Sequence, residues 1–459
     1  MALTDIERPD RFADSTAWHL QGNNAPVIDE VTLTDLEVKG ALPGELSGHF
    51  MRNGANPQTG MSEHWFIGDG MVHGLRIADG KAQWYRNRYV RTPMHANPGA
   101  DRTELSLDPE TFEMDLTVSA ANTHVIGHGG RILALEEGGF PYELSAELDT
   151  IGPYDFGGEL KSAMTAHPKI CPETGELLFF GYGVLTAPYL TYYRADASGK
   201  LLQATPVDMG GPTMVHDFAV SRNNIVVMDL PMVFDLELAM QGGMPIRWSN
   251  DYQPRMGVMP REGGAMTWFD VDPCYVFHTL NAHDEGDDVV VMRACRLNRL
   301  WLDSADMDSG SADDNARLHE WAFNTKTGKV TDRALDDAAS EFPRMADAEA
   351  GFDSRFGWAL SMRDEAKGGA LFKYDLHNEA AREIHEFAPG VSPGEPIHVA
   401  ADGAKSADEG WLMTFTYDKS TDTSSFVVLD AHDMSADPVA EVPLPVRVPT
   451  GFHGSWIAD

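Results

Sequence analysis

Short runs of β-branched, aromatic and aliphatic residues recur along the whole chain, separated by clusters of Gly, Pro, Asn and Asp. Such runs are typical of β-strands, and the residues between them are typical of turns. Long helical periodicities are rare, so the strands do not alternate with helices as they do in parallel sheets. We predict strands over residues 48–52, 81–90, 131–135, 177–182, 225–229, 289–293, 370–374, 411–417 and 425–429.

This pattern predicts an all-β fold. A chain of 459 residues is long enough for two or three average domains, but a β-propeller uses this length as one unit. The spacing of the runs fits a propeller best, in a single domain spanning residues 1–459. No strict repeat of the WD or kelch type is present, so any blades have diverged in sequence.

The segment from Met214 to Phe218 is predicted to be a short buried strand that carries one histidine, His216. A polar break at 221–224 separates it from a second β-rich run at 225–231, and such a pair of runs predicts a β-hairpin. The polar, acid-rich stretches 303–315, 332–340 and 401–409 are predicted to be solvated loops.

The chain carries 71 acidic and 35 basic side chains, which gives a formal net charge of −36, and the acidic residues are spread along it. A surface this negative repels phosphate backbones, so nucleic acid is not an expected partner. Lys is scarce relative to Arg, and this balance suits a high-salt habitat in which charges are screened.

Three cysteines, Cys171, Cys274 and Cys295, are far apart in the sequence, and this sparse, odd set indicates a reducing compartment. The first residues are acidic where a secretory signal is basic, and no apolar run approaches the roughly 18 residues that cross a bilayer. We therefore expect a soluble, cytoplasmic protein. The segment from Leu230 to Met244 is interpreted as a loop packed on the core or as a peripheral contact with lipid.

Four histidines occupy apolar, proline-flanked or glycine-rich contexts, namely His167, His216, His278 and His453. Any one of them is more simply explained as a packed, hydrogen-bonded histidine. Together they suggest a metal site, because the inner strands of propeller blades face one axis and bring distant residues together. Imidazole ligands suit Fe, Zn, Cu and Ni. Four ligands would close a structural zinc site, whereas octahedral Fe(II) would keep two positions for O2 or substrate.

Three glutamates lie in apolar or turn-rich settings where an unpaired carboxylate is costly, namely Glu137, Glu341 and Glu395. A metal-bound imidazole normally donates its other N–H to a carboxylate or carbonyl group, so these residues are candidates for that role. The alternative is that each is a surface carboxylate. Six other histidines lie in polar or alternating contexts and are predicted to face solvent: His124, His128, His319, His377, His385 and His432.

These segments resemble the carotenoid cleavage oxygenases, a non-haem iron family that includes apocarotenoid oxygenases, lignostilbene dioxygenases, isoeugenol oxygenases and retinoid isomerases. The resemblance runs along nearly the whole chain, in family order. It rests on GHFMRNGANP at 48–57, the segment 64–73, AHPK at 166–169 with TGE at 174–176, HDF at 216–218, FH at 277–278 with NA at 281–282, EFPR at 341–344, EPI at 395–397 and FHG at 452–454.

The resemblance implies a seven-bladed β-propeller with Fe(II) on its axis and a cap of loops and helices over a substrate tunnel. It implies that His167, His216, His278 and His453 bind the metal, and that Glu137, Glu341 and Glu395 accept hydrogen bonds from such ligands. The implied reaction is cleavage of a conjugated carbon–carbon double bond by O2, which gives two carbonyl products. The iron would activate O2 while apolar walls hold one alkene beside it.

The substrate is the least constrained part of this interpretation. Stilbene and isoeugenol cleavers are similar in placing a lysine directly before the first of these glutamates, where it would bind a phenol oxygen, and here that position is Glu136. This difference favours an apocarotenoid or carotenoid, with a stilbene or phenylpropanoid as the alternative. A monooxygenase or isomerase outcome and a non-catalytic propeller that binds a hydrophobic ligand stay open. Candidate tunnel residues, which are otherwise core residues, are Trp65, Phe140, Phe234, Trp268, Phe352 and Trp358, with Glu136.

Overall fold

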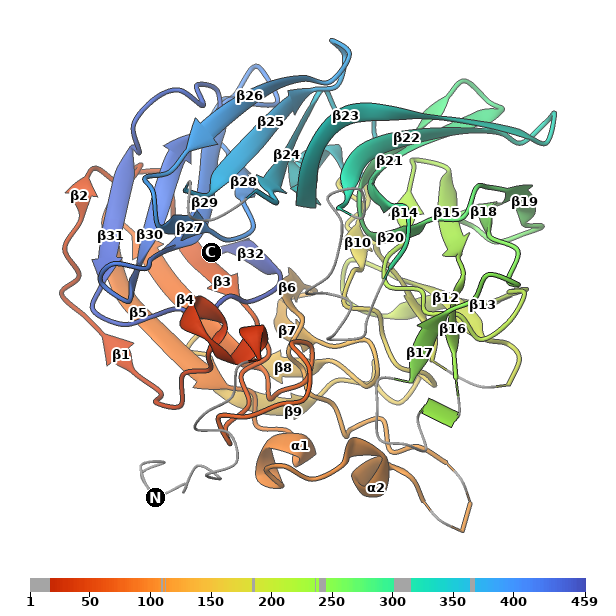
Figure 1. Ribbon diagram of the computed structural model, residues 1–459, viewed down its shortest axis with the longest axis horizontal. Helices are drawn as coiled ribbons and strands as arrows, with labels where there is room; N and C mark the ends of the chain where they lie inside the picture. Colours follow the sequence, from red (N-terminus) through yellow and green to blue (C-terminus); the bar gives the residue numbers. More distant parts are fainter. Residues whose placement is uncertain are drawn as a thin grey trace. The chain divides into compact units, whose positions relative to one another are not determined.

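The computed structural model describes residues 17–108, 110–111, 113–183, 186–235, 237–238, 245–300, 315–363 and 368–459 (Figure 1). Regular structure in this part of the chain is almost entirely β, which confirms the predicted fold class. The helical segments are short and include α1 (Pro93–Ala96), α2 (Arg102–Ser106), η3 (Trp18–Leu20), η4 (Gly22–Asn24) and η6 (Asp347–Glu349). None of the helices within the described ranges is long and apolar enough to cross a membrane.

The chain divides into two compact units. Unit 1 comprises Met1–Ala166, Asp364–Ala370 and His385–Asp459, and unit 2 comprises His167–Arg363 and Leu371–Ile384. Across the described residues the strands form seven sheets, and the pairings between neighbouring strands are antiparallel. The prediction of a single propeller domain concerns the arrangement of these sheets and stays a prediction.

Unit 1 contains three of these sheets. The first has the order β1-β5-β4-β3-β32, so the C-terminal strand pairs with β3 near the other end of the chain (Figure 1). Its strands are β1 (Thr32–Leu33), β5 (Lys81–Tyr89), β4 (Met71–Ala78), β3 (Gly48–Arg52) and β32 (Gly454–Ala458). The second consists of β6 (His124–His128), β7 (Arg131–Leu135), β8 (Tyr142–Leu144) and β9 (Thr150–Pro153). The third consists of β2 (Lys39–Gly40), β31 (Ala440–Leu444), β30 (Thr423–Asp430), β29 (Gly410–Asp418) and β27 (Val391–Pro393), with β28 (Ile397–Ala400) also on β29.

Unit 2 contains the other four sheets. The first consists of β10 (Lys169–Ile170), β11 (Leu177–Gly181), β12 (Leu190–Ala195) and β13 (Leu201–Val207). The second consists of β14 (Ala219–Val220), β15 (Asn224–Asp229), β18 (Arg255–Pro260) and β19 (Thr267–Asp270), and the third of β16 (Met232–Phe234) and β17 (Ile246–Trp248). The fourth consists of β20 (Tyr275–Glu285), β21 (Val289–Leu297), β22 (Arg317–Asn324), β23 (Lys329–Arg344), β24 (Phe356–Ser361), β25 (Ala370–Asp375) and β26 (Ala381–Glu386). Three of its residues, Ala370, His385 and Glu386, are assigned to unit 1.

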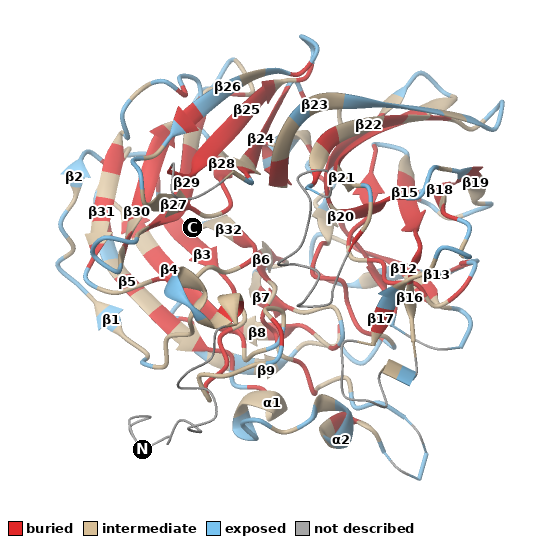
Figure 2. Cartoon of the chain, in the orientation of Figure 1, coloured by how far each residue is buried: buried red, intermediate tan, exposed pale blue. Residues whose placement is uncertain are grey.

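All nine predicted strands are confirmed, as β3, β5, β7, β11, β15, β21, β25, β29 and β30, and the bounds of β3 and β7 agree to the residue. Burial explains why these runs were recognisable. The strands β3 and β11 are buried along their whole length, and Figure 2 shows that the middle strands of several sheets are mostly buried. In unit 1, for example, Phe50 packs against Phe415 and Phe426, with ring centroids 5.2 and 5.1 Å apart.

Two predictions about secondary structure were wrong. The segment from Met214 to Phe218 is not a strand, because the hairpin begins only at β14, where Ala219 pairs with Val226 of β15. The amide of Phe218 donates to the side chain of Asp217 (2.7 Å) instead of to a neighbouring strand. The stretch 332–340 is not a loop but part of β23, because its backbone pairs with β22 while its acidic side chains stay largely exposed.

Other predictions from the sequence concern surface loops, the cysteines and the segment from Leu230 to Met244. The loop at 401–409 is confirmed between β28 and β29, whereas 303–314 lies outside the described residues. Cys171, Cys274 and Cys295 are buried and free. Of the segment from Leu230 to Met244, residues 232–234 form β16, and residues 236 and 239–244 lie outside the described part. Contact of this segment with lipid stays a prediction.

Candidate metal centre

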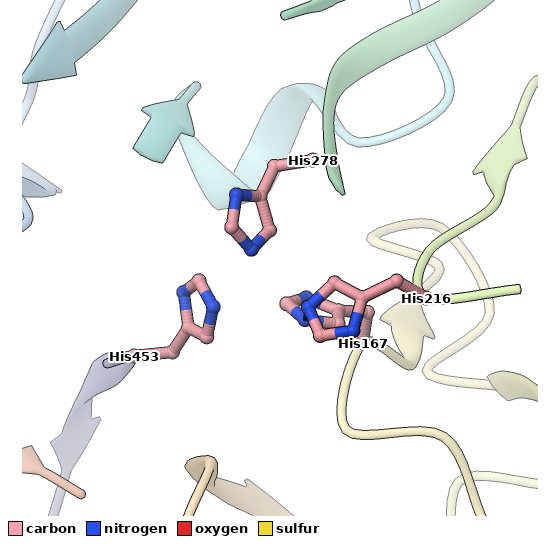
Figure 3. A group of neighbouring side chains, drawn as sticks. All are labelled: His167, His216, His278 and His453. Atoms are coloured by element: carbon pink, nitrogen blue, oxygen red, sulfur yellow. Dashed lines mark hydrogen bonds between the residues drawn. The ribbon is translucent and has the colours of Figure 1, made fainter. Parts of the chain in front are cut away.

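Four imidazoles come together although their positions in the sequence are tens to hundreds of residues apart. One nitrogen of each of His167, His216, His278 and His453 lies within 4.8 Å of the corresponding nitrogen of every other. Figure 3 shows the four rings turned toward a common space. These are the four residues that the sequence predicts as ligands, and the arrangement is one that could hold a metal ion.

The histidines lie at the beginnings of strands or at an irregularity within one. His167 precedes β10 by two residues, His216 precedes β14 by three, and His453 comes directly before β32. His278 lies inside β20, where the pairing with β21 shifts register between Val276 and Thr279. A shift of this kind re-aims a side chain out of the regular alternation of a strand.

Within unit 2 the three imidazoles are in mutual contact. The ring centroid of His167 lies 4.5 Å from that of His216 and 5.0 Å from that of His278, and the last two are 5.2 Å apart. The Nε2 atoms of His167 and His216 are 3.0 Å apart. Ligand nitrogens about 2.1 Å from a first-row metal ion and at right angles also lie about 3.0 Å apart. The spacing and the neutral nitrogen donors therefore fit a divalent transition metal.

Carboxylates fix the orientation of two of the rings. The Nδ1–H of His278 donates to Glu341 (2.6 Å), and the Nδ1–H of His453 donates to Glu395 (2.9 Å). Glu395 also accepts the backbone N–H of Gly454 (2.9 Å). An imidazole that donates from Nδ1 presents the lone pair of Nε2, which is the form that binds a metal.

Phe342 adds a second constraint on His278. Its ring stacks on the imidazole with a centroid separation of 5.2 Å and an interplanar angle of 29°. Its backbone has a φ of 51°, in the left-handed region that bulky residues rarely adopt, and its N–H donates to Glu341 (2.5 Å). One strained residue thus holds both the imidazole and the carboxylate.

Glu136 and Glu137 occupy the turn after β7 and have different surroundings. Glu136 forms an ion pair with Arg102 (2.8 Å) and accepts hydrogen bonds from Ser119 (3.2 Å) and the amide of Gly138 (2.9 Å). Burial alone would lower the pKa of Arg102, but Glu136 and, more weakly, Glu137 raise it above its ordinary value. The role of Glu137 beside a ligand histidine stays a prediction.

Three histidines predicted to face solvent are instead buried, namely His124, His128 and His385, whereas His377 and His432 are exposed. The alternating pattern around His124 and His128 belongs to the largely buried strand β6.

His124 also contributes to the site, which the sequence did not indicate. Its Nδ1 lies 2.8 Å from the carbonyl of Ala166 and its Nε2 lies 3.2 Å from the carbonyl of Gly454. It thus contacts the residue before His167 and the residue after His453.

The six aromatic residues proposed for the tunnel are scattered over the described structure. The ring of Trp65 lies 5.0 Å from that of Phe452, the residue before His453. Arg255 covers the ring of Trp268, and Arg222 lies over Phe352. The other three residues have different surroundings. Trp358 is fully buried in β24, Phe234 packs on a core cluster of unit 2, and the amide of Phe140 donates to the carbonyl of Leu116. Their contact with a substrate stays a prediction.

Comparison with known proteins identifies the family to which the chain belongs. A family model described as "RPE65: Retinal pigment epithelial membrane protein" matches residues 24–458. A protein of Mycobacterium tuberculosis named "Carotenoid cleavage oxygenase" is 35% identical over 97% of this chain and 98% of its own length. The "Carotenoid 9,10(9',10')-cleavage dioxygenase 1" of Arabidopsis thaliana is 35% identical over 96% of this chain and 90% of its own length.

A solved structure gives the same result. The lignostilbene dioxygenase of Pseudomonas brassicacearum has 29% sequence identity and a TM-score of 0.86, over 96% of this chain and 98% of that one. The family model and the two relatives cover nearly all of this chain, and the names of the two relatives describe oxygenases. The chain is therefore an oxygenase that belongs to the RPE65 and carotenoid cleavage oxygenase family.

Proposed function

We propose that this protein cleaves a conjugated carbon–carbon double bond of an apocarotenoid or carotenoid with O2, using Fe(II) held by His167, His216, His278 and His453. The observation that carries the proposal is the convergence of four imidazoles, two of which donate to buried carboxylates. The strands would form one seven-bladed propeller spanning residues 1–459, with the metal on its axis and a cap of loops and helices over a substrate tunnel.

The donor set supports a metal that keeps open positions. Four neutral imidazoles leave two positions of an octahedron for O2 or substrate, and imidazole is a ligand that iron accepts. Bound Fe(II) would supply the binding and activation of O2. The protein's own task is to hold the rings: Glu341 and Glu395 keep each Nδ1 protonated and each Nε2 available.

In the proposed reaction the carbon–carbon double bond and the O–O bond break, and two C=O bonds form. Both atoms of O2 therefore end in the products, and no external reductant is consumed. No proton has to be transferred to or from a side chain, so positioning by apolar walls is the main contribution expected from the tunnel. Trp65 is an aromatic candidate for these walls, because its ring packs against Phe452, the residue before the proposed ligand His453.

The ion pair and hydrogen bonds of Glu136 support an apocarotenoid substrate over a phenolic one. Its carboxylate is already engaged by Arg102, Ser119 and the amide of Gly138. A side chain with these partners is poorly suited to accept a further hydrogen bond from a phenol. The second candidate function is cleavage of a hydroxystilbene, and the similarity to a lignostilbene dioxygenase favours it.

The proposal is tested by measuring the iron content of the purified protein and then following absorbance with apocarotenals and with hydroxystilbenes under air. We expect about one iron per chain and O2-dependent bleaching of the polyene, with oxygen-18 from O2 in both products. Consumption of the hydroxystilbene alone would select the second function. Full activity after removal of iron, without another metal, would contradict both.

A further inference from the structure

Asp217 contacts all three chain segments that carry the histidines of unit 2. It directly follows His216 in the sequence. One carboxylate oxygen forms an ion pair with Lys169 (2.8 Å), two residues after His167. The other accepts hydrogen bonds from the amide (2.7 Å) and the hydroxyl (2.8 Å) of Thr279, directly after His278.

The carboxylate is buried and charged. Its side chain is 1% exposed, and it also accepts the amide of Phe218 (2.7 Å). Burial alone would raise the pKa of Asp217, but the charge of Lys169 and the hydrogen bonds from Thr279 outweigh it, and the pKa lies below the ordinary 3.8. The ion pair with Lys169 leaves little net charge to act on a nearby metal, so the contribution of Asp217 is geometric.

The same segments are weakly fixed by strand pairing. The strands β10 and β14, which follow His167 and His216, are two residues long each, and β20 loses its register with β21 around His278. Few backbone hydrogen bonds therefore determine where these three histidines lie. A carboxylate accepts several strong hydrogen bonds at once, and a buried one is costly to disturb.

We infer that Asp217 is a positioning residue that holds His167, His216 and His278 at metal-binding spacing by joining their segments through one buried carboxylate. The inference rests on the proposed function, because it assumes that these histidines bind a metal. It adds a residue whose effect on the metal would pass through the backbone of three segments and not through a hydrogen bond to an imidazole.

The test compares metal binding by Asp217→Asn with metal binding by a matched control, Asp229→Asn. Asp229 is also fully buried in unit 2, in an ion pair with Arg255 (3.0 Å), and accepts hydrogen bonds from the amide of Gly210 and the hydroxyls of Thr213 and Tyr252. Both variants lose a buried carboxylate with an arginine or lysine partner, so a general loss of stability affects both. Of the control's partners only Thr213, three residues before His216, lies near one of the four histidines in the sequence, so Asp229 does not join two histidine-bearing segments.

Metal binding is measured by titrating the metal-free protein with Co²⁺ and recording its visible absorption, which reports ligand geometry without turnover. We expect the dissociation constant of Asp217→Asn to rise at least tenfold and its absorption bands to shift. Asp229→Asn should keep the wild-type dissociation constant and spectrum, even if its melting temperature falls. An unchanged constant and spectrum in Asp217→Asn would overturn the inference.

Two milder variants keep the test decisive if Asp217→Asn does not fold. Lys169→Met releases the segment of His167, and Thr279→Val removes one of the two bonds to the segment of His278. We expect each to weaken Co²⁺ binding by a smaller factor and to shift the spectrum. Wild-type behaviour in both would also overturn the inference. Failure of the wild-type protein itself to bind Co²⁺ or iron would instead contradict the proposed function.

Discussion

Single residues determine how the imidazoles of this protein are presented. Glu395 illustrates this, because its two oxygens accept the Nδ1–H of His453 and the amide of the next residue, Gly454. The ring and the start of β32 are therefore fixed by the same carboxylate. His124 acts in a comparable way through the carbonyls of Ala166 and Gly454.

The substitution Glu395→Gln should weaken metal binding by roughly 10- to 100-fold, because a glutamine has one acceptor oxygen for two donors. The change is measured by anaerobic titration of the metal-free protein. Glu441→Gln is the control, since Glu441 forms a partly exposed ion pair with Lys39. Equal affinities for the two variants would contradict a role of Glu395 in orienting His453.

A second prediction at this scale concerns pH. Burial, with a smaller effect from His19, lowers the pKa of His64 to about 4, and its Nδ1 accepts the amide of Phe66 (3.1 Å). Between pH 6.5 and 4 the unfolded chain binds a proton here and the folded chain does not, so stability falls as pH falls. From pH 7.5 to pH 5, the wild type should lose about 2 kcal/mol more unfolding free energy than His64→Asn.

This difference is measured by urea unfolding at both pH values. Other buried histidines titrate in both proteins, so their contribution cancels in the comparison. Asn is chosen because its side-chain oxygen can still accept the amide of Phe66. An equal loss of stability in the wild type and the variant would show that His64 takes up its proton in the folded state as easily as in the unfolded one.

At the scale of elements, strand pairing sets the position of the residues beside the site. The strand β32 begins directly after His453, and Gly454 pairs with Arg52 of β3. A β-carbon on Gly454 would lie 2.4 Å from the carbonyl oxygen of Met51, which is backbone and cannot rotate away. The two strands approach this closely only because residue 454 has no side chain.

The substitution Gly454→Ala should therefore force β32 away from β3 and lower the free energy of unfolding by about 1–3 kcal/mol. Gly44→Ala is the control, because a β-carbon there meets no atom within 4 Å, and its effect should stay within about 0.5 kcal/mol. Both are measured by chemical denaturation. Equal stability of the two variants would mean that the strands separate at no cost.

The elements also show how far sequence reasoning reaches. All nine predicted strands exist. Eight of them bury several side chains in a row and β5 buries its side chains in alternation, and both arrangements leave a pattern in the sequence. The segment from Met214 to Phe218 has the same apolar character, but its amides donate to the side chain of Asp217 and to the carbonyl of Met232 in β16, which no local pattern reveals. The prediction of a loop at 332–340 was wrong for the opposite reason, since an exposed strand is as polar as a loop.

The candidate site divides in the same way. The four histidines were identifiable because their contexts recur and together resemble one family. Glu341 and Glu395 were identifiable as carboxylates in costly surroundings, and the structure pairs each with a histidine. The roles of His124, Lys169 and Thr279 depend on contacts between segments far apart in the sequence. A single sequence carries no record of such contacts.

At the scale of the whole molecule, charge is the dominant feature. A formal net charge of −36 makes the folded chain repel itself, and compaction brings like charges closer together. Ion pairs such as that of Arg222 with Glu173 act in the opposite direction, but exposed pairs contribute little. The repulsion should therefore dominate the effect of salt on stability.

We expect the melting temperature to rise by several degrees as the NaCl concentration increases from about 0.1 to 1 M, because the Debye length falls from about 10 to 3 Å. Scanning calorimetry measures the change, and KCl should give the same curve as NaCl if screening is the cause. A melting temperature that falls with salt would show that ion pairs outweigh the repulsion.

The pairing of β3 with β32 has a consequence for synthesis. Residues 48–52 leave the ribosome roughly 400 residues before residues 454–458, which complete their sheet, and at about 5–20 residues per second this is a delay of some 20–80 s. Unit 2 consists mostly of one continuous stretch, His167–Arg363, and can fold during that interval. The nascent chain thus carries an open, apolar sheet edge until residues 454–458 have been made, and it is exposed to aggregation throughout that interval.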